Sequence, residues 1–315
     1  MSCVPVPAPA TASNTGEACA NCGKGGSAAI KLKNCNACFL VKYCSVDCQK
    51  IHRKQHKKAC KERAAELKDD KLFSQGTERA EEDFCPLCQL AIPMPSGNDG
   101  RRQCIFYLCC LKMVCEGCGF AAKKRGMLGC PFCRTPIEGN DVKSVGMIQK
   151  RVAAKDPVAI VHLGFAHFQG MYGLEKSVSR ATELWLEAAE LGSIKALGKI
   201  GASHYYGSDG LARDTVKGIQ CWEVAAMQGE IGSRHMLGVV ELGNRKFDRA
   251  VRHFLISAKL GHKGSLDSIK MIFALGLASE NQYAEALKGY QDAVEEMKSP
   301  DRDAVAALLD DSFAY

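Results

Sequence analysis

Cysteine is the residue type in this sequence that is best placed to do chemistry. The chain of 315 residues has 18 cysteines, and 16 of them fall between Cys19 and Cys133, mostly in pairs with two or three residues between the partners. Thiolates at this spacing hold zinc in a reducing compartment or form disulfides in exported proteins. Residues 1–16 have neither a basic start nor an apolar core, so they do not resemble a signal peptide. We therefore expect a zinc-binding protein of the cytoplasm or nucleus that is not secreted.

The first set of candidate ligands has eight members, enough for two tetrahedral zinc sites. They are Cys19, Cys22, Cys35, Cys38, Cys44, Cys48, His56 and Cys60. On a helix, His56 and Cys60 share one face and can reach the same ion, and the polar segment from Gln49 to Ala65 suits a helix. His52, one helical turn earlier, is an alternative ligand, which we expect instead to be a solvated side chain.

A second set of eight cysteines follows and predicts two further zinc ions, four in all. They are Cys85, Cys88, Cys109, Cys110, Cys115, Cys118, Cys130 and Cys133. Side chains of adjacent residues diverge, so Cys109 and Cys110 are an awkward pair for one metal. Cys104 is therefore an alternative to Cys109, although we prefer Cys109.

Beyond residue 150 the sequence repeats itself at intervals of 37 residues. The recurring positions are Leu163-Gly164, Ile200-Gly201 and Leu237-Gly238, with Trp185 recurring as Trp222 and then as Phe254. A period of this length, with two amphipathic runs in each unit, is typical of a helical-hairpin solenoid.

The histidines of this region share no short spacing, so we expect structural or solvated roles for them; they are His162, His167, His204 and His235. Cys221, beside Trp222, is expected to be a small core residue.

These patterns predict two small zinc-stabilised domains followed by an all-α solenoid of helical-hairpin repeats. The expected segments are a disordered N-terminus at 1–16, a zinc finger at 17–62, a charged helical linker at 63–83, a second zinc finger at 84–137, a capping helix at 142–155, helical repeats at 156–298 and a C-terminal capping helix at 299–315. No apolar run approaches the roughly 18 residues of a membrane span, so no membrane partner is expected.

The first ligand set resembles the MYND zinc finger over residues 19–60, including the Tyr43-Cys44-Ser45 step. The resemblance implies that Cys19, Cys22, Cys44 and Cys48 hold one zinc ion and that Cys35, Cys38, His56 and Cys60 hold the other. It also implies a protein-interaction module for short proline-containing peptides. Arg53 stands near the position where the family usually has an aromatic residue.

The second ligand set ends in Cys-Pro-Phe-Cys-Arg and resembles an all-cysteine RING finger. The resemblance implies a cross-brace in which Cys85, Cys88, Cys115 and Cys118 hold one ion and Cys109, Cys110, Cys130 and Cys133 hold the other. RING fingers recruit a ubiquitin-conjugating enzyme. Here Leu87 and Pro131 would form the apolar dock, and Arg134 would bridge the enzyme and ubiquitin. Ala122 stands where a bulky residue is common, and Phe120 is the nearest substitute.

The repeats resemble Sel-one-like repeats, relatives of the tetratricopeptide repeat, over residues 156–291, and this resemblance implies an adaptor with a concave binding surface. Two functional hypotheses follow. The first is a zinc-dependent ubiquitin ligase whose repeats and MYND finger recruit substrate, and the alternative is a non-catalytic scaffold for protein partners.

The formal charge of the chain is +7, but fifteen thiolates and four Zn²⁺ ions would bring it to about zero. Nucleic acid is therefore not expected as a partner.

Overall fold

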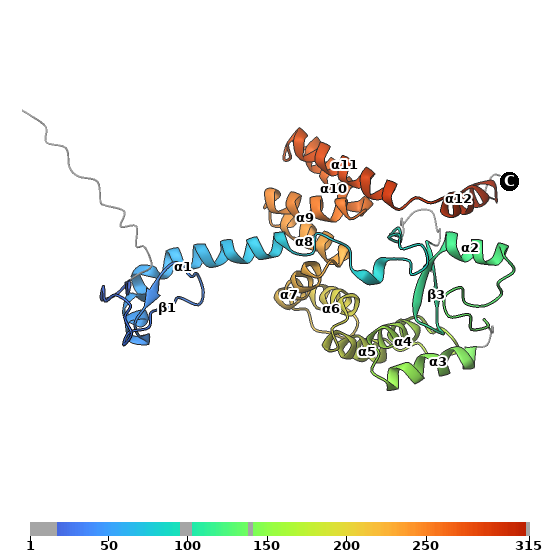
Figure 1. Ribbon diagram of the computed structural model, residues 1–315, viewed down its shortest axis with the longest axis horizontal. Helices are drawn as coiled ribbons and strands as arrows, with labels where there is room; N and C mark the ends of the chain where they lie inside the picture. The colour runs from blue at the N-terminus through green and yellow to red at the C-terminus, as the bar shows by residue number, and fades with distance from the viewer. Residues whose placement is uncertain (1–17, 95–102, 138–140, 313–315) are drawn as a thin grey trace, which may run out of the picture. The chain divides into compact units, whose positions relative to one another are not determined.

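The computed structural model describes residues 18–94, 103–137 and 141–312 (Figure 1). The predicted disordered segment at 1–16 lies outside these ranges. The chain divides into two compact units, Met1–Leu72 and Phe73–Tyr315. Within the described ranges, no helix is long and apolar enough to cross a membrane.

The first unit is a small finger with little regular structure. Strands β1 (Lys33–Asn34) and β2 (Lys42–Tyr43) pair antiparallel, and α1 (Val46–Ser74) follows. The buried core of the finger consists of three cysteines and Tyr43. A core this small has too little apolar area to hold a fold, so the finger depends on its metal ligands. Helix α1 is rich in Lys, Glu, Gln, Arg and Ala, all strong helix formers, and it continues through residue 63, where the sequence predicted a separate linker.

The second unit begins with an irregular part that contains the second cysteine set. Its elements are the 3₁₀ turn η1 (Glu81–Asp83), strands β3 (Cys104–Tyr107) and β4 (Lys112–Cys115), and helix α2 (Glu116–Lys124). The two strands form an antiparallel hairpin in which Cys104 lies opposite Cys115. Its turn contains Cys109 and Cys110, and the hairpin leads directly into α2 with Cys115 as the N-cap. We call residues 84–137 the RING-like module.

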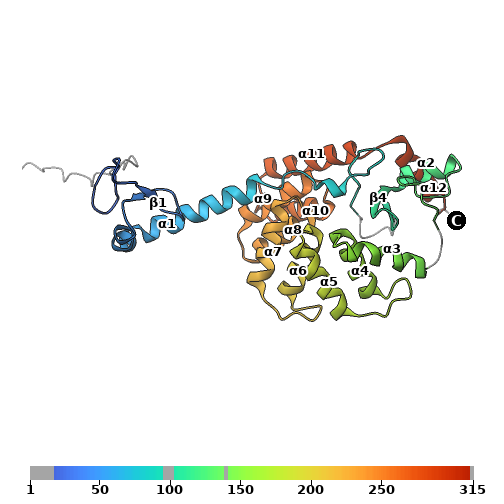
Figure 2. The same ribbon diagram turned by 60° about the horizontal axis from the view of Figure 1, so that its bottom comes forward.

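The remainder of the second unit is helical (Figure 2). The helices are α3 (Asp141–Ala153), α4 (Pro157–Gln169), α5 (Val178–Glu190), α6 (Ile194–Tyr206), α7 (Thr215–Met227), α8 (Ile231–Gly243), α9 (Phe247–Lys259), α10 (Lys263–Ala274), α11 (Glu280–Glu296) and α12 (Pro300–Ser312). Helices α4 and α5, α6 and α7, and α8 and α9 pack as successive hairpins. The predicted helical-hairpin solenoid is confirmed.

Repeated caps fix the helix boundaries of the solenoid. Asp156, Ser193 and Glu230 are spaced by 37 residues, and each accepts hydrogen bonds from the first backbone N–H groups of the helix that follows it. Such caps satisfy donors that a helix start leaves without partners. Gly170 and Gly207, also 37 residues apart, end α4 and α6 in the left-handed conformation, which glycine adopts without steric cost.

The small residues of each repeat allow large aromatic side chains into the seam between paired helices. A Cβ atom on Gly164 would lie 2.5 Å from Trp185 Nε1, and one on Gly201 would lie 2.8 Å from Trp222. Trp185, Trp222 and Phe254 are almost completely buried. The repeating tryptophan position is therefore the interior of the solenoid, as the periodicity predicted.

The RING-like module packs into the start of the solenoid. Leu111 belongs to the same apolar core as Ile148 of α3 and Ile160 of α4. Phe106 stacks on His162 of α4, with 4.4 Å between the ring centroids. The module thus shares its apolar core with the first helices of the solenoid.

Helix α12 packs against α2 of the RING-like module (Figures 1 and 2). The sequence predicted instead that this C-terminal helix would cap the repeat stack. The close approach is possible because Gly117 has no side chain: a Cβ atom there would lie 2.7 Å from the backbone nitrogen of Arg302. Arg302 also donates to the carbonyl oxygens of Ala91 and Met297, at 2.7 and 2.6 Å.

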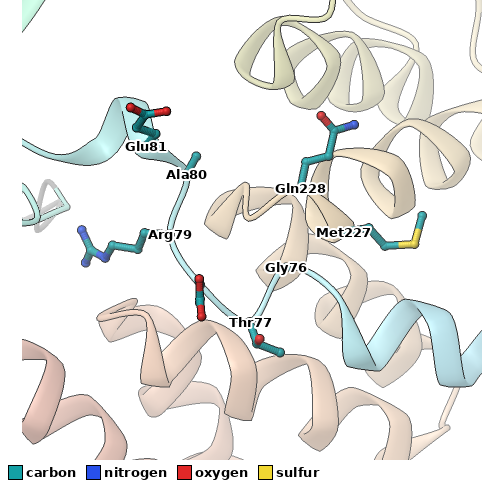
Figure 3. A pocket seen from close by; sticks show the side chains of 8 residues that line it. Gly76, Thr77, Arg79, Ala80, Glu81, Met227 and Gln228 are labelled. Atoms are coloured by element: carbon teal, nitrogen blue, oxygen red, sulfur yellow. The ribbon is translucent and has the colours of Figure 1, made fainter.

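Residues 75–80 run without helical structure over the turns of the second and third repeats (Figure 3). Arg234 Nη2 donates to the carbonyl oxygen of Gln75 at 2.6 Å. Arg79 donates to the carbonyl oxygens of Leu260 and Ile92, at 2.9 and 2.6 Å. The predicted helical linker at 63–83 is α-helical only as far as Ser74 and irregular from there to η1, and the carbonyl oxygen of Gln75 accepts from Arg234 instead of continuing the helix.

Replacing Trp222 with alanine should leave a void in the seam between α6 and α7. We expect Trp222→Ala to lower the free energy of unfolding of the second unit by about 3–5 kcal/mol, measured by urea or thermal denaturation. Val216→Ala is the matched control, because Val216 lies on the same helix and is 64% exposed. Equal stability of Trp222→Ala and the wild type would show that Trp222 does not lie in the interior of the solenoid.

Candidate metal centres

The structure brings the candidate ligands together in four clusters, each with its ligand atoms within 4.8 Å of one another. The clusters are Cys19, Cys22, Cys44 and Cys48; Cys35, Cys38, His56 and Cys60; Cys85, Cys88, Cys115 and Cys118; and Cys109, Cys110, Cys130 and Cys133. In both units the clusters interleave along the chain. These are the sets that the two family resemblances imply.

The sulfur separations fit zinc and not disulfides. Four thiolates at about 2.3 Å from a tetrahedral zinc ion lie about 3.8 Å apart, whereas disulfide sulfurs lie about 2.0 Å apart. The Sγ–Sγ distances are 3.5 Å for Cys22 and Cys44, 3.7 Å for Cys35 and Cys60, and 3.8 Å for Cys88 and Cys115. The cysteines are free. The four clusters accommodate about four zinc ions per chain.

Tight turns present one Cys-x-x-Cys pair of ligands to each of three clusters. In each turn a backbone N–H donates to the backbone carbonyl oxygen of the first cysteine of the pair, at 2.8–3.0 Å. The donors are Phe39 to Cys35, Gln89 to Cys85 and Arg134 to Cys130. Phe39, Gln89 and Arg134 all have positive φ angles, between 57° and 62°. Each is the first residue after a Cys-x-x-Cys pair, so the left-handed conformation at this position turns both thiols towards one ion.

Helix α1 presents the last ligands of the finger. Cys48, His56 and Cys60 are spaced so that they lie on one face, and His56 Nε2 is 3.2 Å from Cys38 Sγ. His52 lies on this face too. Its Nδ1 is 3.1 Å from Tyr43 Oη, and its ring stacks on His56 at 5.8 Å. The expected solvated role of His52 is therefore wrong: the side chain supports the position of a ligand, a role that its spacing from Cys48 and His56 could have indicated.

Cys109, and not Cys104, belongs to the fourth cluster. Cys109 Sγ is 3.3 Å from Cys133 Sγ, and Cys110 Sγ is 3.7 Å from Cys130 Sγ. Both adjacent cysteines lie in the turn between β3 and β4, and their sulfur atoms nevertheless fall within one cluster, so the difficulty expected for neighbouring cysteines does not arise. Cys104 lies on β3 with its Sγ 3.8 Å from Met113 Sδ.

Each cluster contains at least one thiol whose pKa lies below its ordinary value. Burial raises the pKa of Cys19, but backbone hydrogen bonds outweigh it and lower the pKa to about 6. The same balance lowers the pKa of Cys35 to about 6, and hydrogen bonds that include the Thr135 side chain do so for Cys133. For Cys85, a hydrogen bond from Cys115 is the main cause of a pKa of about 4. Thiolates are the zinc-binding form, so each cluster offers one near neutral pH.

Arg302 supports the third cluster from outside. Its Nη2 lies 3.5 Å from Cys88 Sγ and 3.3 Å from the carbonyl oxygen of Leu90. Burial disfavours the guanidinium, yet the thiols of Cys115 and Cys88 outweigh it and raise the pKa of Arg302. The residue is far from these cysteines in the sequence, so no local pattern could have predicted this contact.

The residues predicted for recruitment of a ubiquitin-conjugating enzyme lie in or directly after two Cys-x-x-Cys loops, Cys85–Cys88 and Cys130–Cys133, which we call the zinc knuckles. Leu87 is 40% exposed and Phe132, next to Pro131, is 44% exposed. Pro131 is half-buried and Arg134 is exposed. Ala122 is buried, whereas the ring of Phe120 lies 5.1 Å from Lys124 Nζ. Apolar surface therefore flanks both knuckles of the RING-like module.

The remaining candidates carry no metal-binding geometry in the described residues. His162 hydrogen-bonds Tyr172 and His235 hydrogen-bonds Ser265. His204 is buried, and His167 lies 3.4 Å from the carbonyl oxygen of Glu175. A shallow pocket where residues 76–81 pass Met227 and Gln228 is lined by neither cysteine nor histidine (Figure 3).

Two family models match parts of the chain. Residues 19–60 match the MYND finger family, and residues 157–193, 194–230 and 233–262 match the Sel1 repeat family. Among solved structures, the chain is similar to a Sel1 repeat protein from Oxalobacter formigenes, with 24% identity and a TM-score of 0.45 over 51% of this chain and 67% of that chain. It is also similar to c5321, a protective antigen of uropathogenic Escherichia coli with an SLR fold, with 21% identity and a TM-score of 0.41 over 49% of this chain and 33% of that chain. No curated protein sequence matches it significantly.

The matches and the four clusters define the class of the protein. The chain contains a MYND finger and Sel1 repeats, both of which are protein-interaction modules, and it binds zinc. The RING-like module lies between these two matched regions and holds two of the four clusters.

Cys38→Ser should empty one zinc site of the finger and destabilise the finger alone. Cys38 is 1% exposed and its cluster shares the finger with another, so loss of the ligand removes a crosslink that the small core cannot replace. Elemental analysis should fall from about four zinc ions to three, while the tryptophan fluorescence transition of the second unit stays unchanged. Cys104→Ser is the control and should keep four ions. Unfolding of the repeats in Cys38→Ser would contradict the division into two units.

Arg302→Gln should loosen the third cluster. Groups that hydrogen-bond metal ligands typically contribute about 10–100-fold to metal affinity. We therefore expect the zinc affinity of the third cluster to be lower than in the wild type by a factor in that range, measured by competition with a chromophoric chelator. Arg180→Gln, which alters an exposed ion pair with Glu183, is the matched control. Identical zinc transfer from both variants would show that Arg302 does not support the cluster.

Proposed function

We propose that the protein is a RING-type ubiquitin-protein ligase in which the RING-like module recruits a ubiquitin-conjugating enzyme. The observation that carries the proposal is the exposed apolar surface at both zinc knuckles, formed by Leu87 and Phe132, with Arg134 beside it. Interleaved zinc clusters would hold the two knuckles in fixed positions, which a docking surface for a second protein requires.

The residues would have separate tasks. Leu87 and Pro131 would contact apolar side chains of the conjugating enzyme and supply affinity. Arg134 would donate hydrogen bonds from its planar guanidinium to both the enzyme and ubiquitin, which would hold the thioester in a reactive conformation. The module would supply no nucleophile, because the attacking amine comes from the substrate.

Substrate recruitment would fall to the repeats and the MYND finger. Because the RING-like module shares an apolar core with α3 and α4, a substrate held by the repeats would lie in a fixed relation to the bound conjugating enzyme. A second candidate, a scaffold without ligase activity, has its own support. Ala122 is buried where a bulky exposed residue is common in ligases, and α12 covers part of α2.

The test uses the purified full chain with a panel of ubiquitin-charged conjugating enzymes. Arg134 has a φ of 62°, so asparagine, which tolerates this conformation, is a better replacement than alanine. Arg134→Asn should keep all four zinc ions and slow ubiquitin discharge by about tenfold or more, the equivalent of about 1.4 kcal/mol. Arg134→Lys should also be slow, because a point charge cannot replace the planar fork.

Gln89→Asn is the matched control, since Gln89 occupies the same position in the other knuckle with a φ of 60°. Its discharge rate should equal that of the wild type. Leu87→Ala should weaken recruitment, seen as a higher concentration of conjugating enzyme at half-maximal rate. No discharge by the wild type with any enzyme of the panel would favour the scaffold.

A further inference from the structure

Helix α1 has a strongly basic face within the first unit. Six basic residues recur at positions i, i+3, i+4, i+7, i+8 and i+11, and all six are exposed. They are Lys50, Arg53, Lys54, Lys57, Lys58 and Lys61. With 3.6 residues per turn, this spacing places them along one side of the helix. We call these six residues the basic stripe.

The basic stripe points away from the zinc ligands. Cys48, His56 and Cys60 lie on the opposite side of the same helix, where the metal clusters form. The lysines therefore do not contact the thiolates whose charge they could otherwise neutralise. Since the metal side anchors the helix to the finger, the stripe is held rigid and open to solvent.

No ion pair compensates the charge of the stripe within the described residues. The sequence has no acidic residue between Asp47 and Glu62, whereas the next basic residue on the helix, Arg63, pairs with Glu66 at 2.9 Å. The stripe contains four like-charged pairs with i,i+4 spacing, each of which destabilises the helix by a few tenths of a kcal/mol. They are Lys50 with Lys54, Arg53 with Lys57, Lys54 with Lys58, and Lys57 with Lys61. A purely solvating face would gain from mixed charges, so the uniform sign favours an external anionic partner.

Apolar side chains flank the start of the stripe. Val46 is 64% exposed and Ile51 is 68% exposed, and both lie on the first two turns of α1. An acidic protein segment can offer carboxylates to the lysines and an apolar side chain to Val46 and Ile51 at the same time. A nucleic-acid backbone offers only the charge, and the exposed side of α1 has no aromatic residue for base stacking.

We propose that the basic stripe of α1 is a docking surface for an acidic protein segment that carries an apolar residue next to its carboxylates. From Lys50 to Lys61 the stripe extends over about 17 Å, which matches about five residues of extended chain or three turns of a partner helix. The surface is separate from the RING-like module, and its role does not depend on ubiquitin transfer.

The test measures binding of a fluorescein-labelled peptide of repeated Glu-Glu-Leu units to the zinc-loaded full chain by fluorescence anisotropy, at increasing salt concentration. The variant Lys54→Glu/Lys57→Glu/Lys58→Glu reverses the centre of the stripe. The matched control, Lys24→Glu/Lys31→Glu/Lys33→Glu, makes the same change of charge at exposed lysines elsewhere in the finger. Zinc content is measured for both variants, to confirm that the finger remains folded.

We expect the stripe variant to bind the peptide about tenfold more weakly or worse, whereas the control variant keeps most of its affinity. Val46→Ser/Ile51→Ser should weaken binding of this peptide but not of a Glu-Glu-Ser peptide of equal charge. Equal loss in both lysine variants would overturn the proposal, because it would show attraction to net charge alone. Tighter binding of an RNA or DNA oligonucleotide, or of phosphatidylserine vesicles, than of the peptide would also overturn it.

Discussion

Tetrahedral binding of zinc by interleaved thiolates is the constraint on which the N-terminal part of this protein depends. The finger buries only three cysteines and Tyr43 in its core, and the RING-like module has a core built mainly from its own ligands and a few neighbours such as Val114 and Ile92. Each zinc site contributes on the order of 10 kcal/mol, which such cores cannot supply. Because the clusters interleave along the chain, the two sites of a module also fix each other's loops.

The solenoid is stabilised differently, by apolar packing that repeats every 37 residues. Trp185, Trp222 and Phe254 fill the seams that Gly164, Gly201 and Gly238 open. The two kinds of stabilisation meet in the second unit, where Leu111 joins the core of α3 and α4 and Arg302 of α12 reaches Cys88. A RING-like module fixed in this way is an integral part of the repeat unit rather than an appendage on a linker, which suits a protein that brings one partner to another.

Much of this architecture was predictable from sequence because its determinants are local or periodic. Ligand spacings predicted four zinc ions, and recurring glycine and tryptophan positions predicted the solenoid. Several of the unpredicted features involve residues far apart in the chain. Arg79 reaches Leu260, and Arg302 reaches Ala91; neither lies in a motif, and an arginine on a polar segment gives no indication of its distant partner.

The sequence by itself determined which atoms can bind metal and the interval at which the repeat helices recur, since these depend on thiol spacing and on a 37-residue period. Only the tertiary structure decided that Cys109 rather than Cys104 completes the fourth cluster, that residues 75–80 leave the helix, and that α12 packs on α2 and not on the repeat stack. Those outcomes depend on the direction of side chains at a hairpin turn and on close backbone approach at Gly117. Both are properties of the folded chain in three dimensions, which no short stretch of sequence encodes.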